Sequence, residues 1–131
     1  MPAPKILIVE DEALVATSLE MLLEDHGYDV VGWAVGHDDA LAIAESHRPT
    51  VALVDIRLQD GDDGIALAGL LASRFDTAII FLTAQSDPST VARARAVRHR
   101  AYLRKPYDAG QVLGALREAA GDRGIEPRGV D

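Results

Sequence analysis

The sequence predicts an α/β fold in which five helices cover a doubly wound, five-stranded parallel sheet. Three short apolar runs, residues 5–9, 51–54 and 77–82, do not alternate with polar residues, which is typical of strands buried on both faces. Amphipathic helical patterns fill the intervals, so that strand and helix alternate five times along the chain. The chain has 131 residues, of which 48% are hydrophobic, enough for one domain with its own core.

Weaker patterns complete the alternation. Residues 28–34 predict the second strand and residues 101–103 the fifth, while residues 38–47 and 88–97 predict the second and fourth helices. The other three helices are marked by apolar residues spaced three or four positions apart. These residues are Val15, Leu19 and Leu22, then Ala68, Leu71 and Phe75, then Val112, Leu113, Leu116 and Ala120.

Residues with known capping preferences mark the helix ends. Asp38, Asp87 and Asp108 are predicted N-caps, because an aspartate side chain accepts hydrogen bonds from backbone N–H groups of the first turn. Gly27 and Gly121 are predicted at helix ends, where glycine tolerates positive φ. We therefore predict a domain over residues 1–120 and a flexible, Gly-, Pro- and charge-rich tail over residues 121–131.

Composition excludes several classes of function. The net charge is −8, and residues 1–64 carry 14 acidic but only 3 basic residues, which disfavours nucleic-acid binding. The absence of cysteine excludes disulfides, thiolate zinc sites and cysteine nucleophiles. No apolar run approaches the ~20 residues of a membrane span, and the start of the chain has no signal-peptide pattern. We expect a cytoplasmic protein with no membrane partner.

Chemically capable residues follow the strands. Glu10 and Asp11 come directly after the first strand, Asp55 after the third and Thr83 after the fourth, while Lys105 follows the fifth. Because ligands bind outside the carboxyl ends of parallel strands, these side chains are predicted to meet at one edge of the sheet. Three adjacent carboxylates repel one another unless a cation lies between them, and Mg²⁺, which prefers oxygen ligands, fits best.

Taken singly, these residues have simpler explanations. Asp11 could equally cap the first helix, and Thr83 could serve only strand-end hydrogen bonding. Asp55 favours a functional role more strongly, because a carboxylate that ends an apolar strand is costly to bury without partners. The joint spacing is what makes the pattern specific.

The order Glu10-Asp11, Asp55, Thr83-Ala84 and Lys105-Pro106 resembles the receiver domain of two-component response regulators, of the single-domain, stand-alone type. The resemblance covers about residues 5–120. It implies a flavodoxin-like sheet with strand order 2-1-3-4-5.

The resemblance also implies a role for each motif residue. Asp55 would be the phosphoacceptor, taking a phosphoryl group from a sensor histidine kinase or a phosphotransfer protein. Asp11, Asp55 and the backbone carbonyl of Arg57 would bind Mg²⁺ directly, while Glu10 would act largely through water. Lys105 would pair with the phosphoryl group or, before phosphorylation, with Asp55.

The family's switch would use two further residues. Thr83 would donate its hydroxyl to the phosphoryl group, and Tyr102 would be the aromatic residue that moves inward as Thr83 shifts. Arg57 and Gln85 occupy positions where the family tunes phosphoryl lifetime. The chain departs from the usual pattern at Gln59, where proline is common, in a loop one residue longer than usual before Gly64, and at Arg98-His99, where a Gly-Ala pair is frequent.

The function implied is a phosphorylation-controlled switch that is not an enzyme acting on other molecules. No helix-turn-helix or catalytic domain follows residue 120, so we expect output through protein contact. The resemblance places the downstream target, and a homodimer if one forms, on the face made by the fourth helix, fifth strand and fifth helix. It implies no direct contact with nucleic acid.

Two alternatives remain at this point. A haloacid-dehalogenase-like phosphatase also uses Asp, Thr, Lys and Mg²⁺, but it expects an acid at position 57, which is Arg, and its metal-binding acids come late in the chain. A phosphate-independent interaction module is the other.

Several other patterns receive a less specific interpretation. A basic run near the fourth helix is either a solvated face or a docking site for an acidic partner. Trp33 is interpreted as packing at the second strand and the four histidines as surface residues. The Asp-rich loop from residue 60 lacks the final Glu of a calcium loop. The basic residues are Arg93, Arg95, Arg98 and Arg100, and the histidines are His26, His37, His47 and His99.

Overall fold

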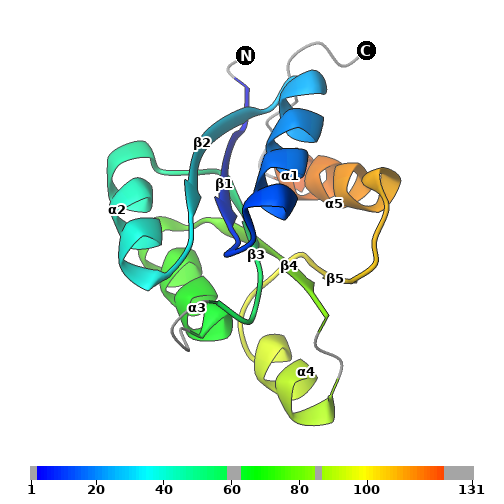
Figure 1. Cartoon of the computed structure of the whole chain (residues 1–131). Helices are drawn as coiled ribbons and strands as arrows, with labels where there is room; N and C mark the ends of the chain where they lie inside the picture. Colours follow the sequence, from blue (N-terminus) through cyan, green and yellow to red (C-terminus); the bar gives the residue numbers. More distant parts are fainter. Residues whose placement is uncertain (1–2, 59–62, 85–86, 123–131) are drawn as a thin grey trace.

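The computed structural model describes residues 3–58, 63–84 and 87–122. Five parallel strands form one sheet in the order β2-β1-β3-β4-β5, which confirms the predicted flavodoxin-like topology (Figure 1). The predicted strand bounds are correct to within one residue. The strands are β1 (Lys5–Val9), β2 (Asp29–Ala34), β3 (Val51–Val54), β4 (Ala78–Thr83) and β5 (Ala101–Arg104).

Helices cover both faces of the sheet. The inward residues of β1 alternate between two cores: Ile6 and Ile8 pack under α1 and α5, whereas Leu7 and Val9 pack under α2 and α3. This alternation follows from the two-residue period of a strand, and it explains why the strands read as uninterrupted apolar runs. The helices are α1 (Ala13–Asp25), α2 (His37–His47), α3 (Gly64–Phe75), α4 (Pro88–Arg95) and α5 (Ala109–Asp122).

The fourth helix is the least embedded. α4 buries only Ala94, and in Figure 1 it projects from the body of the molecule beside β4 and β5. It ends at Arg95, two residues earlier than predicted, with Ala96 as its C-cap. Few buried apolar contacts therefore hold α4 to the sheet, and polar contacts to α3 and its preceding loop take a larger share.

The caps are partly as predicted. Asp87 accepts from the backbone N of Thr90 at 3.0 Å and caps α4. Asp108 and Gln111 form a reciprocal pair, each side chain accepting from the other's backbone N at 2.8 and 2.9 Å. The prediction for Asp38 was wrong: the N-cap of α2 is Gly36, and the Asp39 carboxylate turns back to accept from its N–H.

The chain ends are partly described. Gly27 follows α1 with φ 87°, as predicted for a helix end. α5 runs through Gly121 to Asp122, two residues beyond the predicted domain boundary, and the remaining predicted tail, residues 123–131, lies outside the described residues. Within the described part of the chain, no helix is long and apolar enough to cross a membrane.

Candidate functional site

Three carboxylates meet at the carboxyl edge of the sheet. Glu10 and Asp11 follow β1, and Asp55 follows β3, which is the neighbouring strand. Each residue offers one oxygen, and these three oxygens lie within 4.8 Å of one another. The strand-end pattern in the sequence therefore identified residues that the fold does bring together. Asp11 does not cap α1, since the N-cap residue is Glu12 and makes no side-chain cap bond.

Lys105 reaches this cluster from the far edge of the sheet. Its Nζ donates to Asp55 Oδ2 at 3.0 Å and lies 3.4 Å from Glu10 Oε1. Its backbone N donates to the carbonyl of Thr83 at 2.9 Å, which ties the segment after β5 to the end of β4. Burial alone lowers the pKa of Lys105, but Asp55 and Glu10 outweigh it and raise that pKa above its ordinary value.

Glu10 is the most enclosed acid of the cluster. Its side chain is only 2% exposed, and Oε2 accepts from the backbone N of Glu12 at 3.2 Å. Burial and the neighbouring Asp55 raise the pKa of Glu10 from 4.5 to about 7, against the smaller effects of the Glu12 N–H and Lys105. The protein thus holds negative charge here at a free-energy cost that a bound cation would offset.

The loop after β3 packs closely against Asp55. Asp55 is 8% exposed, and its Oδ1 accepts from the backbone N of Arg57 at 3.2 Å. Gly64 N donates to the Ile56 carbonyl at 2.9 Å, and a Cβ on Gly64 would lie 2.1 Å from the Asp55 carbonyl oxygen. Only glycine therefore permits this approach of α3 to the end of β3.

Asp63 joins that loop to two helices. One oxygen, Oδ1, accepts from the backbone N of Ile65 and of Ala66 and so caps α3. The other oxygen forms an ion pair with Arg93 of α4. Against the effect of burial, Arg93 and the two backbone N–H groups lower the pKa of Asp63.

The two predicted switch residues lie on adjacent strands. Thr83 is the last residue of β4 and is fully buried. Tyr102 in β5 is half-buried and pairs with Phe81 of β4, their ring centroids 5.9 Å apart. Burial raises the pKa of the Tyr102 hydroxyl. Gln85, a predicted modulator of phosphoryl lifetime, lies outside the described residues, as do Gln59 and most of the Asp-rich loop.

The donor set fits a magnesium ion. All three side chains offer carboxylate oxygens, and Mg²⁺ prefers oxygen in octahedral geometry at about 2.1 Å. Opposite ligands of such an octahedron are about 4 Å apart, so oxygens within 4.8 Å of one another need only a small closure or one bridging water. The structure therefore supports an acidic cation site made of Glu10, Asp11 and Asp55.

Trp33 lies in the second strand as interpreted, but it packs there only in part. The residue is 41% exposed, and its Nε1 donates to the backbone carbonyl of Glu10 at 2.6 Å. The histidine prediction holds for His26 and His47, which are exposed. His37 and His99 are half-buried, and the ring centroid of His99 lies 5.4 Å from that of Phe81.

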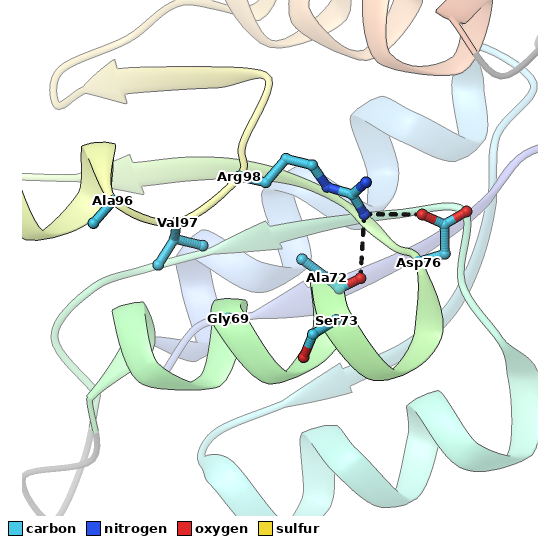
Figure 2. Close-up of a pocket in the computed structure, with 7 residues that line it drawn as sticks. All are labelled: Gly69, Ala72, Ser73, Asp76, Ala96, Val97 and Arg98. Atoms are coloured by element: carbon cyan, nitrogen blue, oxygen red, sulfur yellow. Dashed lines mark hydrogen bonds and ion pairs between the residues drawn. The ribbon is translucent and has the colours of Figure 1, made fainter.

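The basic run does not form one free patch. Arg93 pairs with Asp63, and Figure 2 shows the Arg98 guanidinium reaching across a pocket to Asp76 and to the Ala72 carbonyl at the end of α3. The two Arg98 bonds are 2.8 and 3.2 Å long, respectively. These arginines hold α4 and the loop after it to α3, so the prediction of a shared docking patch loses two of its members.

Comparisons with known proteins identify the family. The response regulator receiver domain model matches residues 6–117. The transcriptional regulatory protein PdtaR of Mycobacterium tuberculosis is 37% identical over 112 residues, 86% of this chain and 54% of PdtaR. The phyllosphere-induced regulator PhyR of Methylorubrum extorquens is 36% identical over 118 residues, 89% of this chain and 43% of PhyR. The chain spans about half the length of these curated relatives.

A solved receiver-domain structure has the same fold as this chain. The signal receiver domain of a modulated diguanylate cyclase from Desulfovibrio desulfuricans G20 superposes with a TM-score of 0.86 at 38% identity, covering 93% of this chain and 97% of that one. The family model, the relatives and the solved structure all indicate the same family. The chain belongs to the response regulator receiver domain family, the signalling module of two-component systems.

Proposed function

We propose that this chain is a phosphorylation-controlled switch in which Asp55 accepts a phosphoryl group in the presence of Mg²⁺. The observation that carries the proposal is the position of Asp55, which lies beside two further carboxylates and accepts from Lys105 Nζ at 3.0 Å. Phosphoryl transfer depends on positioning and on charge neutralisation more than on covalent help from the protein, and this edge of the sheet offers both.

The transfer itself is a displacement at phosphorus. A carboxylate oxygen of Asp55 attacks the phosphorus of a phosphohistidine, and the new P–O bond forms as the P–N bond breaks. The imidazole leaves with the electron pair of that bond and takes up a proton from solvent. Bound Mg²⁺ would neutralise charge on the phosphoryl oxygens, with Glu10, Asp11, Asp55 and the carbonyl of Arg57 as its proposed protein ligands.

Lys105 and Thr83 are proposed to recognise the product. The Lys105 ammonium already lies within hydrogen-bonding distance of Asp55 and would move to a phosphoryl oxygen, an exchange of one anionic partner for another. Thr83 is buried at the end of β4, and its hydroxyl would donate to the same group. Hydrolysis resets the switch: water attacks phosphorus, Asp55 leaves as carboxylate, and inorganic phosphate is released.

The output is proposed to be a change of surface. A phosphorylated side chain adds about −1.5 to −2 charge, enough to bias a two-state element, and Tyr102 on β5 lies next to the strand that ends in Thr83. We propose a sensor histidine kinase or phosphotransfer protein as donor and a protein target on the face of α4, β5 and α5. On this account the chain is not an enzyme toward other substrates.

Intact-mass measurement tests the proposal. The protein is incubated with acetyl phosphate with and without Mg²⁺, beside Asp55→Asn and a control, Asp29→Asn, which changes an exposed aspartate at the opposite end of the sheet. We expect one Mg²⁺-dependent phosphoryl adduct on the parent and on Asp29→Asn, and none on Asp55→Asn. No adduct together with no release of inorganic phosphate would support a phosphate-independent interaction module instead. Multiple turnover of a generic phosphate ester would support a phosphatase.

A further inference from the structure

The single tryptophan of the chain lies beside the acidic cluster. Trp33 is in β2, an edge strand that supplies no carboxylate to the site. Its indole Nε1 nevertheless donates to the backbone carbonyl of Glu10 at 2.6 Å, across 23 positions of sequence. With 41% of the residue exposed, burial of the ring explains only part of why so large an apolar side chain is placed here.

A β-bulge brings Trp33 to this side of the sheet. Ile6 pairs with Val30, but Leu7 pairs with Gly32, so that β2 holds one extra residue, Val31. From that point on, the side chains of β2 exchange faces. Trp33 consequently pairs with Ile8, whose side chain faces α1 and α5.

Gly32 shows that the other face is closed to a large side chain. A Cβ on Gly32 would lie 2.8 Å from the Ile43 side chain of α2. Without the bulge, Trp33 would take the face toward α2, where packing is this tight. The bulge and the glycine together direct the indole toward the turn between β1 and α1.

Two bonds from the end of β2 hold the backbone of Glu10. Its N–H donates to the Ala34 carbonyl at 2.9 Å, and its carbonyl accepts from Trp33. The first is an ordinary ladder bond that any residue could supply. The second depends on a side chain, and it fixes the peptide that joins Glu10 to Asp11, the two adjacent acids of the cluster.

We propose that Trp33 is a positioning residue for the cation site: its indole N–H holds the peptide between Glu10 and Asp11 so that both carboxylates face Asp55. This inference rests on the proposed magnesium site. Groups that hold a metal ligand in place without binding the metal themselves commonly change the metal affinity by about 10–100-fold when they are removed. Loss of the indole N–H should therefore weaken Mg²⁺ binding much more than it lowers the stability of the fold.

The test compares Mg²⁺ affinity with folding stability. Mg²⁺ dissociation constants are measured by calorimetry, and unfolding by urea, for the parent, Trp33→Phe and the control Val35→Ala, which trims a neighbouring exposed apolar residue. We expect Trp33→Phe to raise the dissociation constant about tenfold or more and Val35→Ala to leave it unchanged. Equal affinity in Trp33→Phe and the parent would overturn the proposal.

Two further measurements keep the test independent of folding defects. Because Trp33 is the only tryptophan, it can be replaced throughout by an isosteric analogue with sulfur in place of the indole N–H, which keeps the ring and removes the donor. We expect this protein to lose Mg²⁺ affinity as Trp33→Phe does, and an unchanged dissociation constant would contradict the proposal.

In the parent, the single indole N–H resonance should exchange slowly with solvent and shift on addition of Mg²⁺. A rapidly exchanging indole that ignores Mg²⁺ would overturn the positioning role alone. A parent that binds no Mg²⁺ at millimolar concentration would overturn the metal site, and the positioning role with it.

Discussion

The Glu10→Gln substitution should stabilise the metal-free protein while weakening its response to Mg²⁺. Gln keeps the shape of the side chain, and its single amide oxygen can still accept from Glu12 N, while the contact of Lys105 Nζ with the other carboxylate oxygen is lost. What it removes is a negative charge that is 2% exposed and lies beside Asp55. Neutralising that charge relieves both the burial penalty and the repulsion.

The magnitude follows from the raised pKa of Glu10. In the folded protein the pKa of Glu10 is about 7, whereas its ordinary value, which applies to the unfolded chain, is 4.5. Each pKa unit corresponds to about 1.4 kcal/mol. The ionised side chain therefore destabilises the fold by up to about 3 kcal/mol. Below pH 4.5 the folded and unfolded chains are both protonated at Glu10, and this loss is absent. It grows as the pH rises from 4.5 to 7, because the unfolded chain ionises first.

Urea unfolding at pH 5 and pH 8, in EDTA and in excess Mg²⁺, measures the effect. In EDTA at pH 8 we expect the free energy of unfolding of Glu10→Gln to exceed that of the parent by about 1–3 kcal/mol. At pH 5 we expect a much smaller difference. Excess Mg²⁺ should stabilise the parent more than the variant, since a ligand that binds only the folded state stabilises it by an amount that grows with the logarithm of its affinity. A variant less stable than the parent at pH 8 in EDTA would refute the reasoning.

Three further predictions, made with five substitutions, test the scaffold of the site and the core; urea unfolding measures stability, and acetyl phosphate labelling measures the rate of phosphorylation. Gly64→Ala should destabilise the fold by about 1–3 kcal/mol and slow phosphorylation, because the added Cβ would lie 2.1 Å from the Asp55 carbonyl oxygen. A variant with the stability and the phosphorylation rate of the parent would contradict this close approach. Asp63→Ala should cost about 1 kcal/mol for the lost cap of α3, whereas Asp63→Asn, which keeps an acceptor oxygen, should lose less; equal losses would mean that the cap contributes nothing. Leu71→Ala should lower the free energy of unfolding by about 2–5 kcal/mol. Leu14→Ala, which changes a residue that is 85% exposed, should leave it within about 0.5 kcal/mol of the parent's. Similar losses in both variants would contradict the assigned core.

The strands and the acidic cluster were predictable because each depends on a local rule. A strand buried on both faces must be apolar along its whole length, so residues 5–9, 51–54 and 77–82 are visible in the sequence. The carboxyl ends of parallel strands meet at one edge, so the residues that follow them are expected together. Neither inference depends on the conformation of the loops.

The contacts that were missed depend on the relative placement of distant segments. Arg93 and Arg98 looked like a basic surface, but they pair with Asp63 and Asp76, 30 and 22 positions away, and no periodicity encodes such pairs. The direction of the Trp33 side chain depends on the β-bulge at Val31. The one available signal was Gly32, since an isolated glycine in a strand suggests a bulge.

Locating the phosphoryl group tests the central claim most directly. The protein is phosphorylated with acetyl phosphate and Mg²⁺ and then reduced with borohydride, which converts an aspartyl phosphate to homoserine, and the modified residue is identified by fragmentation of the peptide that contains it. We predict homoserine at position 55 and nowhere else. Modification at another aspartate, with Asp55 intact, would contradict the assignment of Asp55 as the phosphoacceptor.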